Sequence, residues 1–119
     1  MAAKIAKQKI ELFSSEIDEQ KAELSDLLDV LRSFADALDE AKSRGWQPPS
    51  NLVKKRVQAL MDTLSEAEDL YSQFLDPNTT ARAAVSARML LPTWKFQLSE
   101  AQLQPIINAL EPPAYYYYY

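Results

Sequence analysis

Apolar residues recur every seven positions in the first third of the chain, at two phases that lie three residues apart. One phase comprises Ala3, Ile10, Ile17, Leu24, Leu31 and Leu38, and the other comprises Ala6, Phe13, Gln20, Leu27, Phe34 and Ala41. Heptad spacing with no proline or glycine before Gly45 is typical of one long α-helix with an apolar stripe. We therefore expect a helix over residues 3–44, roughly 60 Å long.

The apolar stripe widens halfway along this helix. Up to Glu23 the positions beside it are polar, as in a two-stranded coiled coil: Lys9, Ser14, Glu16, Lys21 and Glu23. From Leu24 onward they become apolar, as in a helix that several neighbours bury: Leu28, Val30, Ala35 and Ala37. Gln20 is the one polar residue on the stripe. We interpret it as tolerated because a glutamine can extend to solvent, the alternative being a role in setting the helix register.

The remaining pattern predicts three shorter helices. Gly45 and the segment Trp46–Pro49 indicate a turn, and 4-3 apolar spacing predicts a helix over 51–75, capped by Ser50 or Asn51. A third helix is expected over 78–91, ended by Pro92, and a fourth over 100–110, opened by a capping box of Ser99 and Gln102. Between them, residues 93–98 alternate apolar with polar, which predicts an extended segment lying across the first two helices.

The expected fold is all-α. It is a long antiparallel helical hairpin, coiled-coil-like, which the two shorter C-terminal helices complete into an irregular helical bundle. We expect residues 1–111 to form a single helical domain, and residues 112–119 a Pro/Tyr C-terminal tail.

Composition argues against catalysis and against cofactors. The 119 residues include one glycine, no histidine and no cysteine. Glycine-rich phosphate loops, His-based triads and Cys/His metal sites all need those residues, so we expect neither an enzyme nor a bound metal or cofactor. The formal net charge of −4 argues against nucleic acid, and the apolar runs are too short to span a membrane. We expect a soluble protein, intracellular (cytoplasmic) or within a particle.

A cluster of cations surrounds the expected first turn, comprising Arg44, Lys54, Lys55 and Arg56 beside Trp46. It could bind an anion or an acidic partner. The alternative is that nearby acidic residues at the end of the first helix neutralise the cations, while Trp46 closes the end of the bundle. We favour this alternative, because cations in the first turn of a helix oppose its dipole and need compensation.

The tail has the most unusual composition in the chain. Its start, Pro112-Pro113-Ala114-Tyr115, resembles the PPxY ligand of WW domains. The five terminal residues Tyr115, Tyr116, Tyr117, Tyr118 and Tyr119 would alternatively suit an interface, where tyrosine gives large amphipathic contact area. Both interpretations stay open on the sequence alone.

The length difference between the first two helices leads to a functional hypothesis. The second is roughly 15 residues shorter, so it leaves the N-terminal stripe of the first uncovered. We expect the stripe residues Ile10, Phe13, Ile17 and Gln20, together with the five tyrosines, to bind a protein partner, as a homo-oligomer or as a subunit of a hetero-complex. The alternative is a closed monomer in which the third and fourth helices cover the stripe.

Two functions are compatible with this pattern. The first is a non-catalytic protein–protein interaction subunit or adaptor, a structural component of a larger cellular or viral assembly. The second is a small acidic regulator or inhibitor that sequesters a partner through the acidic side of the first helix, which extends from Glu16 to Glu40.

Overall fold

The computed structural model describes the backbone of residues 2–110 and the side chains of residues 14–110. These residues form α-helices and no strand: α1 (Ala2–Ser43), α2 (Asn51–Leu75), α3 (Thr80–Gln97) and α4 (Glu100–Leu110). The expected all-α class is confirmed, and the helices pack against one another as a bundle.

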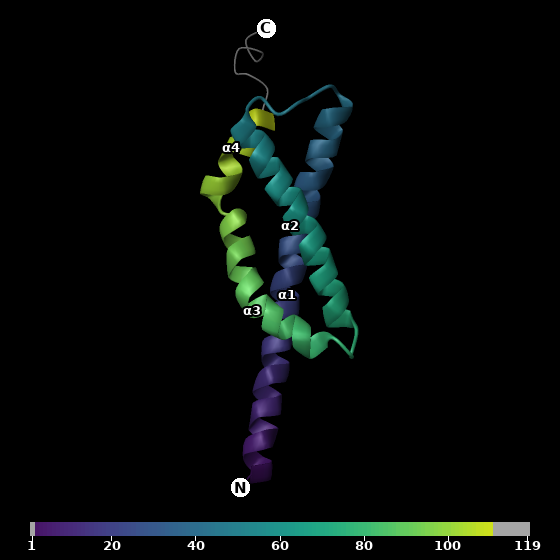
Figure 1. Ribbon diagram of the computed structural model, residues 1–119, viewed down its shortest axis with the longest axis vertical. Coiled ribbons are helices and arrows are strands. Elements are labelled where there is room, and N and C mark those ends of the chain that lie inside the picture. The colour runs from purple at the N-terminus through teal and green to yellow at the C-terminus, as the bar shows by residue number, and fades with distance from the viewer. Residues whose placement is uncertain (1, 111–119) are drawn as a thin grey trace.

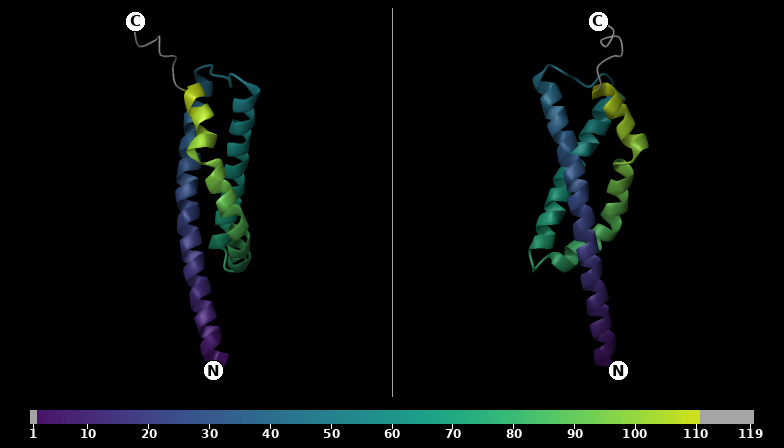
Figure 2. Two further views of the ribbon diagram at one scale, coloured as in Figure 1. Left: turned by 90° about the vertical axis from the view of Figure 1, so that its left-hand side faces the viewer. Right: turned by 180° about the vertical axis from the view of Figure 1, so that it is seen from behind.

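α1 is much longer than the other helices, and α2 packs against α1, α3 and α4 (Figure 1). The chain reverses after α1, so α2 runs in the opposite direction and crosses it. α3 then runs in the direction of α1, and α4 continues along the upper part of α2 (Figure 2). Below the crossing with α3, the N-terminal part of α1 extends beyond the other three helices. The molecule measures 74 × 23 × 23 Å along its principal axes.

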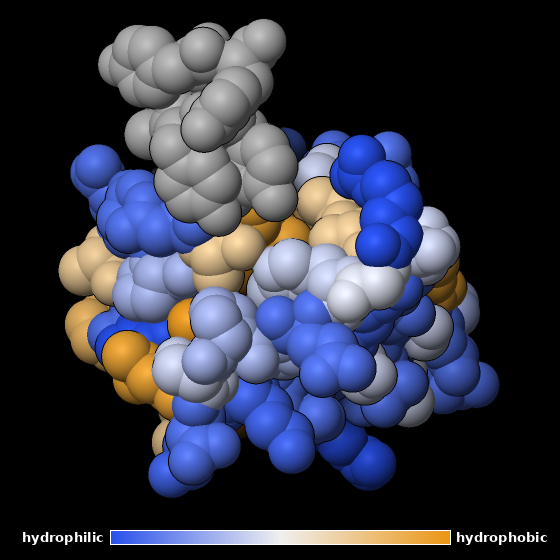
Figure 3. Space-filling view, turned by 90° about the horizontal axis from the view of Figure 1, so that it is seen from above, coloured by the Kyte–Doolittle hydropathy of each residue, from blue (hydrophilic) through white to orange (hydrophobic). Residues whose placement is uncertain are grey.

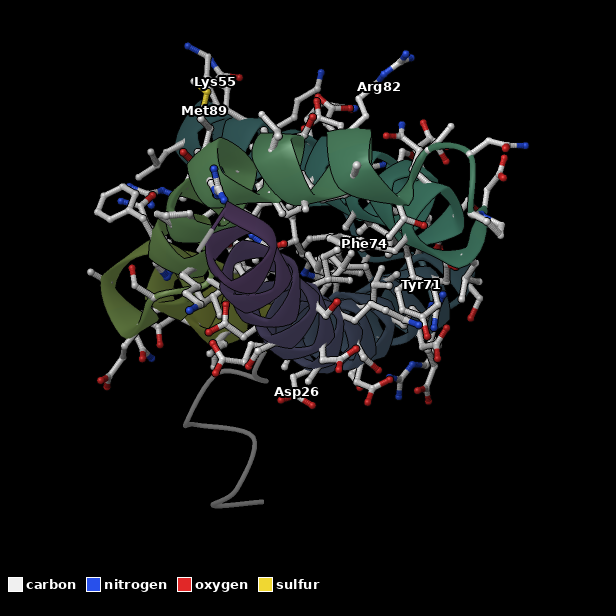
Figure 4. The ribbon with its side chains drawn as sticks, turned by 90° about the horizontal axis from the view of Figure 1, so that it is seen from below. Asp26, Lys55, Tyr71, Phe74, Arg82 and Met89 are labelled. Carbon is white, nitrogen blue, oxygen red and sulfur yellow. The ribbon has the colours of Figure 1, made fainter. Side chains whose placement is uncertain are left out.

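The core lies where α1, α2 and α3 meet. α1 contributes Leu24, Leu28, Leu31 and Leu38, each at most 1% exposed. α2 contributes a 4-3 series that includes Leu60, Leu70 and Phe74, and Figure 4 shows Phe74 pointing into the bundle. α3 contributes small side chains that are fully buried: Ala83, Ala84 and Ala87. Their size allows close helix contact, and the larger Leu91, Trp94, Leu103 and Ile106 fill the upper part of the core.

The turn between α1 and α2 forms as its residues predict. Gly45 has a φ of +92°, the left-handed region that glycine adopts at least cost. Its amide donates to the Lys42 carbonyl at 3.0 Å and the Trp46 amide to the Ala41 carbonyl at 3.0 Å, which is a Schellman C-cap. At the start of α2, the Ser50 hydroxyl accepts from the Val53 amide at 3.2 Å. Both free helix ends thereby gain hydrogen bonds.

The expected end of the third helix at Pro92 is wrong, and so is the extended segment over residues 93–98. α3 continues through the proline to Gln97. The buried positions Ala84, Ala87, Leu91 and Trp94 follow 4-3 helical spacing, so only a helix buries Leu91 and Trp94 together. Pro92 lies on the exposed side, where the Arg88 carbonyl that loses its amide partner can accept from water.

α4 begins at Glu100 as expected, and α3 begins at Thr80, two residues later than expected, with Thr79 at its N-cap position. The Thr79 and Thr80 hydroxyls donate back to carbonyls at the end of α2. The capping box before α4 does not form. The Ser99 hydroxyl is buried with no hydrogen-bond partner among the described residues, and the Gln102 side chain accepts from Arg56 instead.

Candidate functional site

The N-terminal stripe of α1 begins on a part of the helix that extends beyond the rest of the bundle (Figure 1). Ile10 and Phe13 lie on the part of α1 that extends beyond α2 and α3, and their side chains fall outside the described ones. Ile17 is the first stripe residue with a described side chain, and it is half-buried against the core. The part of α1 that precedes Ile17 is roughly 22 Å long.

Gln20 does not extend to solvent as expected. It is only 7% exposed, and its amide nitrogen donates to the Ala84 carbonyl of α3 at 3.1 Å and to Glu16 Oε1 at 3.3 Å. Its own Oε1 has no partner among the described residues. Because α3 of the same chain holds this side chain, Gln20 fixes the position of α3 against α1 rather than offering a surface to a partner.

Two ion pairs join α1 and α3 on either side of Gln20. Arg88 binds the Glu16 carboxylate through two nitrogens, at 2.6 and 2.7 Å, and Lys95 lies 3.0 Å from Glu23. The hydrogen bond from Arg88, and then its charge, lowers the pKa of Glu16 below the usual value, although partial burial opposes this. The same bond raises the pKa of Arg88.

These groups border a hollow of about 200 Å³ between α1 and α3. Its charged residues are Glu16, Glu19, Glu23, Arg88 and Lys95, of which four are already paired with each other across the hollow. Carboxylates paired in this way hold two helices together. We call the two ion pairs, Arg88–Glu16 and Lys95–Glu23, the α1–α3 clamp. The chain contains no histidine or cysteine that could add nucleophilic chemistry to it.

Two of the four cations near the first turn have partners within the chain. Arg56 is half-buried and donates to the Gln102 carbonyl at 3.3 Å and to the Gln102 side chain, and Arg44 lies 3.5 Å from Glu40. Lys54 and Lys55 are exposed, and Figure 4 shows Lys55 pointing away from the bundle.

Trp46 closes this end of the bundle. It is half-buried against the core, and its indole nitrogen donates to the Ala109 carbonyl of α4 at 2.9 Å. Seen from this end, hydrophilic side chains cover most of the described surface, and hydrophobic side chains appear in smaller patches, most of them at the left of the view (Figure 3). Trp46 is therefore part of the fold here, as the favoured alternative expected.

The five terminal tyrosines, Tyr115–Tyr119, and the Pro112–Tyr115 motif lie outside the described residues. They remain predictions from sequence.

The sequence interpretation missed the outer face of α3. Val85, Met89 and Phe96 are 56%, 78% and 65% exposed. A helix that ends at Pro92 would place them in two different elements, so they do not stand out as one face. Their spacing of 4 and 7 residues is a helical signal that could have identified this face.

The described residues contain neither a candidate metal site nor a candidate membrane span. No group of three or more acidic, histidine or cysteine side chains there could hold a metal ion. None of the described helices is long and apolar enough to cross a membrane. Comparison with protein families, curated proteins and solved structures finds no match to this chain.

Proposed function

We propose that this chain is a non-catalytic protein–protein interaction subunit, a structural component of a larger assembly. Its primary contact is the N-terminal part of α1, which pairs along Ile10, Phe13 and the exposed edge of Ile17 with a helix of another subunit. The terminal tyrosines provide a second contact. For the test below we take a second copy of the chain as the partner, since that requires nothing beyond this sequence.

The observation that carries the proposal is the extension of α1 beyond the bundle (Figure 1). An isolated helix of roughly 12 residues is only marginally stable in water, because the free-energy cost of nucleation is not recovered over a few turns. Burying a side chain such as Ile10 or Phe13 stabilises by roughly 1.5–3 kcal/mol each. A helix that extends alone with such residues on one stripe is therefore suited to pairing with a partner helix.

Hydrogen exchange tests this proposal at the segment concerned. Amides of residues 2–13 should exchange fast in dilute protein and become protected as the protein concentration rises, because assembly covers this helix. Amides of residues 24–38, in the core, provide the internal control and should stay protected throughout. Exchange in residues 2–13 that does not respond to concentration would defeat the proposal for self-assembly.

One observation favours the second candidate function, an acidic regulator that sequesters a partner. The side of α1 turned away from α3 carries exposed carboxylates, and Figure 4 shows Asp26 pointing away from the bundle there. Such a row could bind a basic protein, with affinity that falls steeply as salt rises. Replacing Asp26 and Asp29 with asparagine should abolish such binding if this is the function, and leave assembly through residues 2–17 unchanged.

A further inference from the structure

An apolar stripe runs along the outer face of α3. Met89, Phe96 and Val85 are each more than half exposed, and Ala81 and Pro92 beside them are exposed as well. At about 100° per residue, these five positions fall within a sector of about 80°. The opposite side of the same helix carries the buried series that ends in Trp94. α3 is thus apolar on two sides, and the described bundle covers only one.

Cations border this stripe, and α3 carries no carboxylate. Thr80–Gln97 contains Arg82, Arg88 and Lys95 and no acidic residue. By the same helical geometry, Arg82 lies at one edge of the stripe, with Arg88 and Lys95 at the other. Figure 4 shows Arg82 and Met89 both pointing away from the bundle on the same side. The cations at the second edge are paired with Glu16 and Glu23, so the positive character is strongest beside Arg82.

We propose that the outer face of α3 is a docking site for an acidic amphipathic helix of a partner protein. The face is linear, about 27 Å long at 18 residues, which matches the apolar seam of one helix. Acidic side chains beside that seam would meet Arg82. This site lies on α3 and does not depend on the contact proposed for Ile10, Phe13 and Ile17 of α1.

Charge selects this occupant over two others. A second copy of α3 carries cations and no carboxylate, so it would bring no partner for Arg82. A flat anionic membrane would lie against both edges of the face, including Glu16 and Glu23 beside the second edge, whereas a single helix can lie along the Arg82 edge alone. An acidic helix that leans toward the Arg82 edge avoids both conflicts.

Binding of designed peptides to the full chain tests the proposal. The first probe is a peptide of about three heptads with leucine at the core positions and glutamate at the flanking positions, and the second carries lysine at those flanking positions. We expect the glutamate peptide to bind and the lysine peptide to bind at least about tenfold more weakly. Equal binding of the two peptides, or no binding of the glutamate peptide, overturns the proposal.

Substitutions locate the site. The double substitution Met89→Ser with Phe96→Ser should weaken binding of the glutamate peptide about tenfold or more, and so should Arg82→Glu. Leu75→Ser is the matched control, since Leu75 is 59% exposed at the end of α2, and it should leave binding unchanged. Loss of binding in the control, or unchanged binding in the Met89 and Phe96 variant, overturns the assignment.

Two further measurements distinguish helix docking from a folding defect and from membrane binding. The Met89 and Phe96 variant should keep the melting temperature of the parent chain, because both side chains are exposed; an unfolded variant would place them in the core and overturn the proposal. Vesicles of phosphatidylserine and phosphatidylcholine should not bind, and binding that depends on Met89 and Phe96 would assign the face to a membrane. Ile10→Asp, which should disrupt assembly through α1, should leave peptide binding unchanged. The peptide assay therefore tests the α3 site independently of the proposed assembly.

Discussion

Truncating one leucine in the core and one isoleucine on the N-terminal extension of α1 should have unequal effects on stability. Leu31 is completely buried, so Leu31→Ala removes three carbon atoms that water cannot replace. At about 0.8 kcal/mol per carbon, the lost transfer free energy is roughly 2.4 kcal/mol. The cavity left behind adds roughly 1–2 kcal/mol, for a total loss of about 3–4 kcal/mol in the free energy of unfolding.

Ile10→Ala should behave differently, because α2 and α3 do not reach this part of α1 (Figure 1). In dilute, monomeric protein the loss should be no more than about 0.5 kcal/mol, as at other uncovered positions. When the protein assembles, the loss should grow with protein concentration, since assembly stabilises the parent chain by mass action and the variant less.

Urea denaturation followed by circular dichroism at 222 nm measures both effects. Each variant should be unfolded at two protein concentrations about a hundredfold apart, and the midpoints converted to free energies with the slope of the parent chain. Equal losses for Leu31→Ala and Ile10→Ala in protein shown to be monomeric would refute the reasoning, because they would mean that the bundle covers both residues alike.

Three further predictions test the turn, the third helix and its clamp. Gly45→Ala should destabilise by about 1–2 kcal/mol in thermal melts, because an L-residue is strained at φ +92° although nothing blocks its Cβ; an unchanged melting temperature would contradict the cap. Trp94→Ala should lower the free energy of unfolding by about 3–5 kcal/mol and Phe96→Ala by less than about 1 kcal/mol, because only Trp94 is buried. The reverse order in denaturant titrations would favour an extended conformation for residues 93–98 over the helix. The folded pKa of Glu16 lies below 4.5, so the Arg88 pair contributes its full stability above about pH 4.5 and loses it as the pH falls through the lowered pKa. Arg88→Gln should raise the Glu16 pKa in a carboxyl NMR titration, and an unchanged value would rule out the pair.

Where burial follows a regular period, the sequence was sufficient to predict the fold. The 4-3 series in α1 and α2 specified both helices, and Gly45 and Ser50 fixed the ends that face each other, because both act through backbone hydrogen bonds a few residues away. These are local effects, and local effects are visible in a sequence.

The features that were missed depend on contacts between distant segments. Pro92 ends a helix when nothing opposes it, but here the burial of Leu91 and Trp94 against other helices outweighs one lost hydrogen bond. Alternation around Trp94 fits a strand only if Phe96 is counted as buried, and Phe96 is exposed. Gln20 presents the same difficulty, since its acceptor at Ala84 lies 64 residues away.

The candidate sites show the same difference between local patterns and contacts made by distant segments. Trp46 and Arg56 suggest a patch because they are close in sequence, but each bonds to α4, more than 40 residues farther along the chain. The N-terminal stripe, in contrast, is visible from periodicity alone, and its first residues lie on the part of α1 that extends beyond the other helices.

The mass of the protein in solution tests the proposed assembly most directly. Light scattering should be recorded over a wide concentration range for the full chain, for a chain that ends at Pro113, and for Ile10→Asp with Phe13→Asp. Ser15→Asp with Ala22→Asp is the matched control, because it adds the same charges at exposed positions on the other side of α1. The account predicts that the full chain and the control assemble as concentration rises, that the shortened chain assembles more weakly, and that the Ile10 and Phe13 variant stays monomeric. A full chain that is monomeric at every concentration, or an Ile10 and Phe13 variant that assembles like the parent, would contradict it.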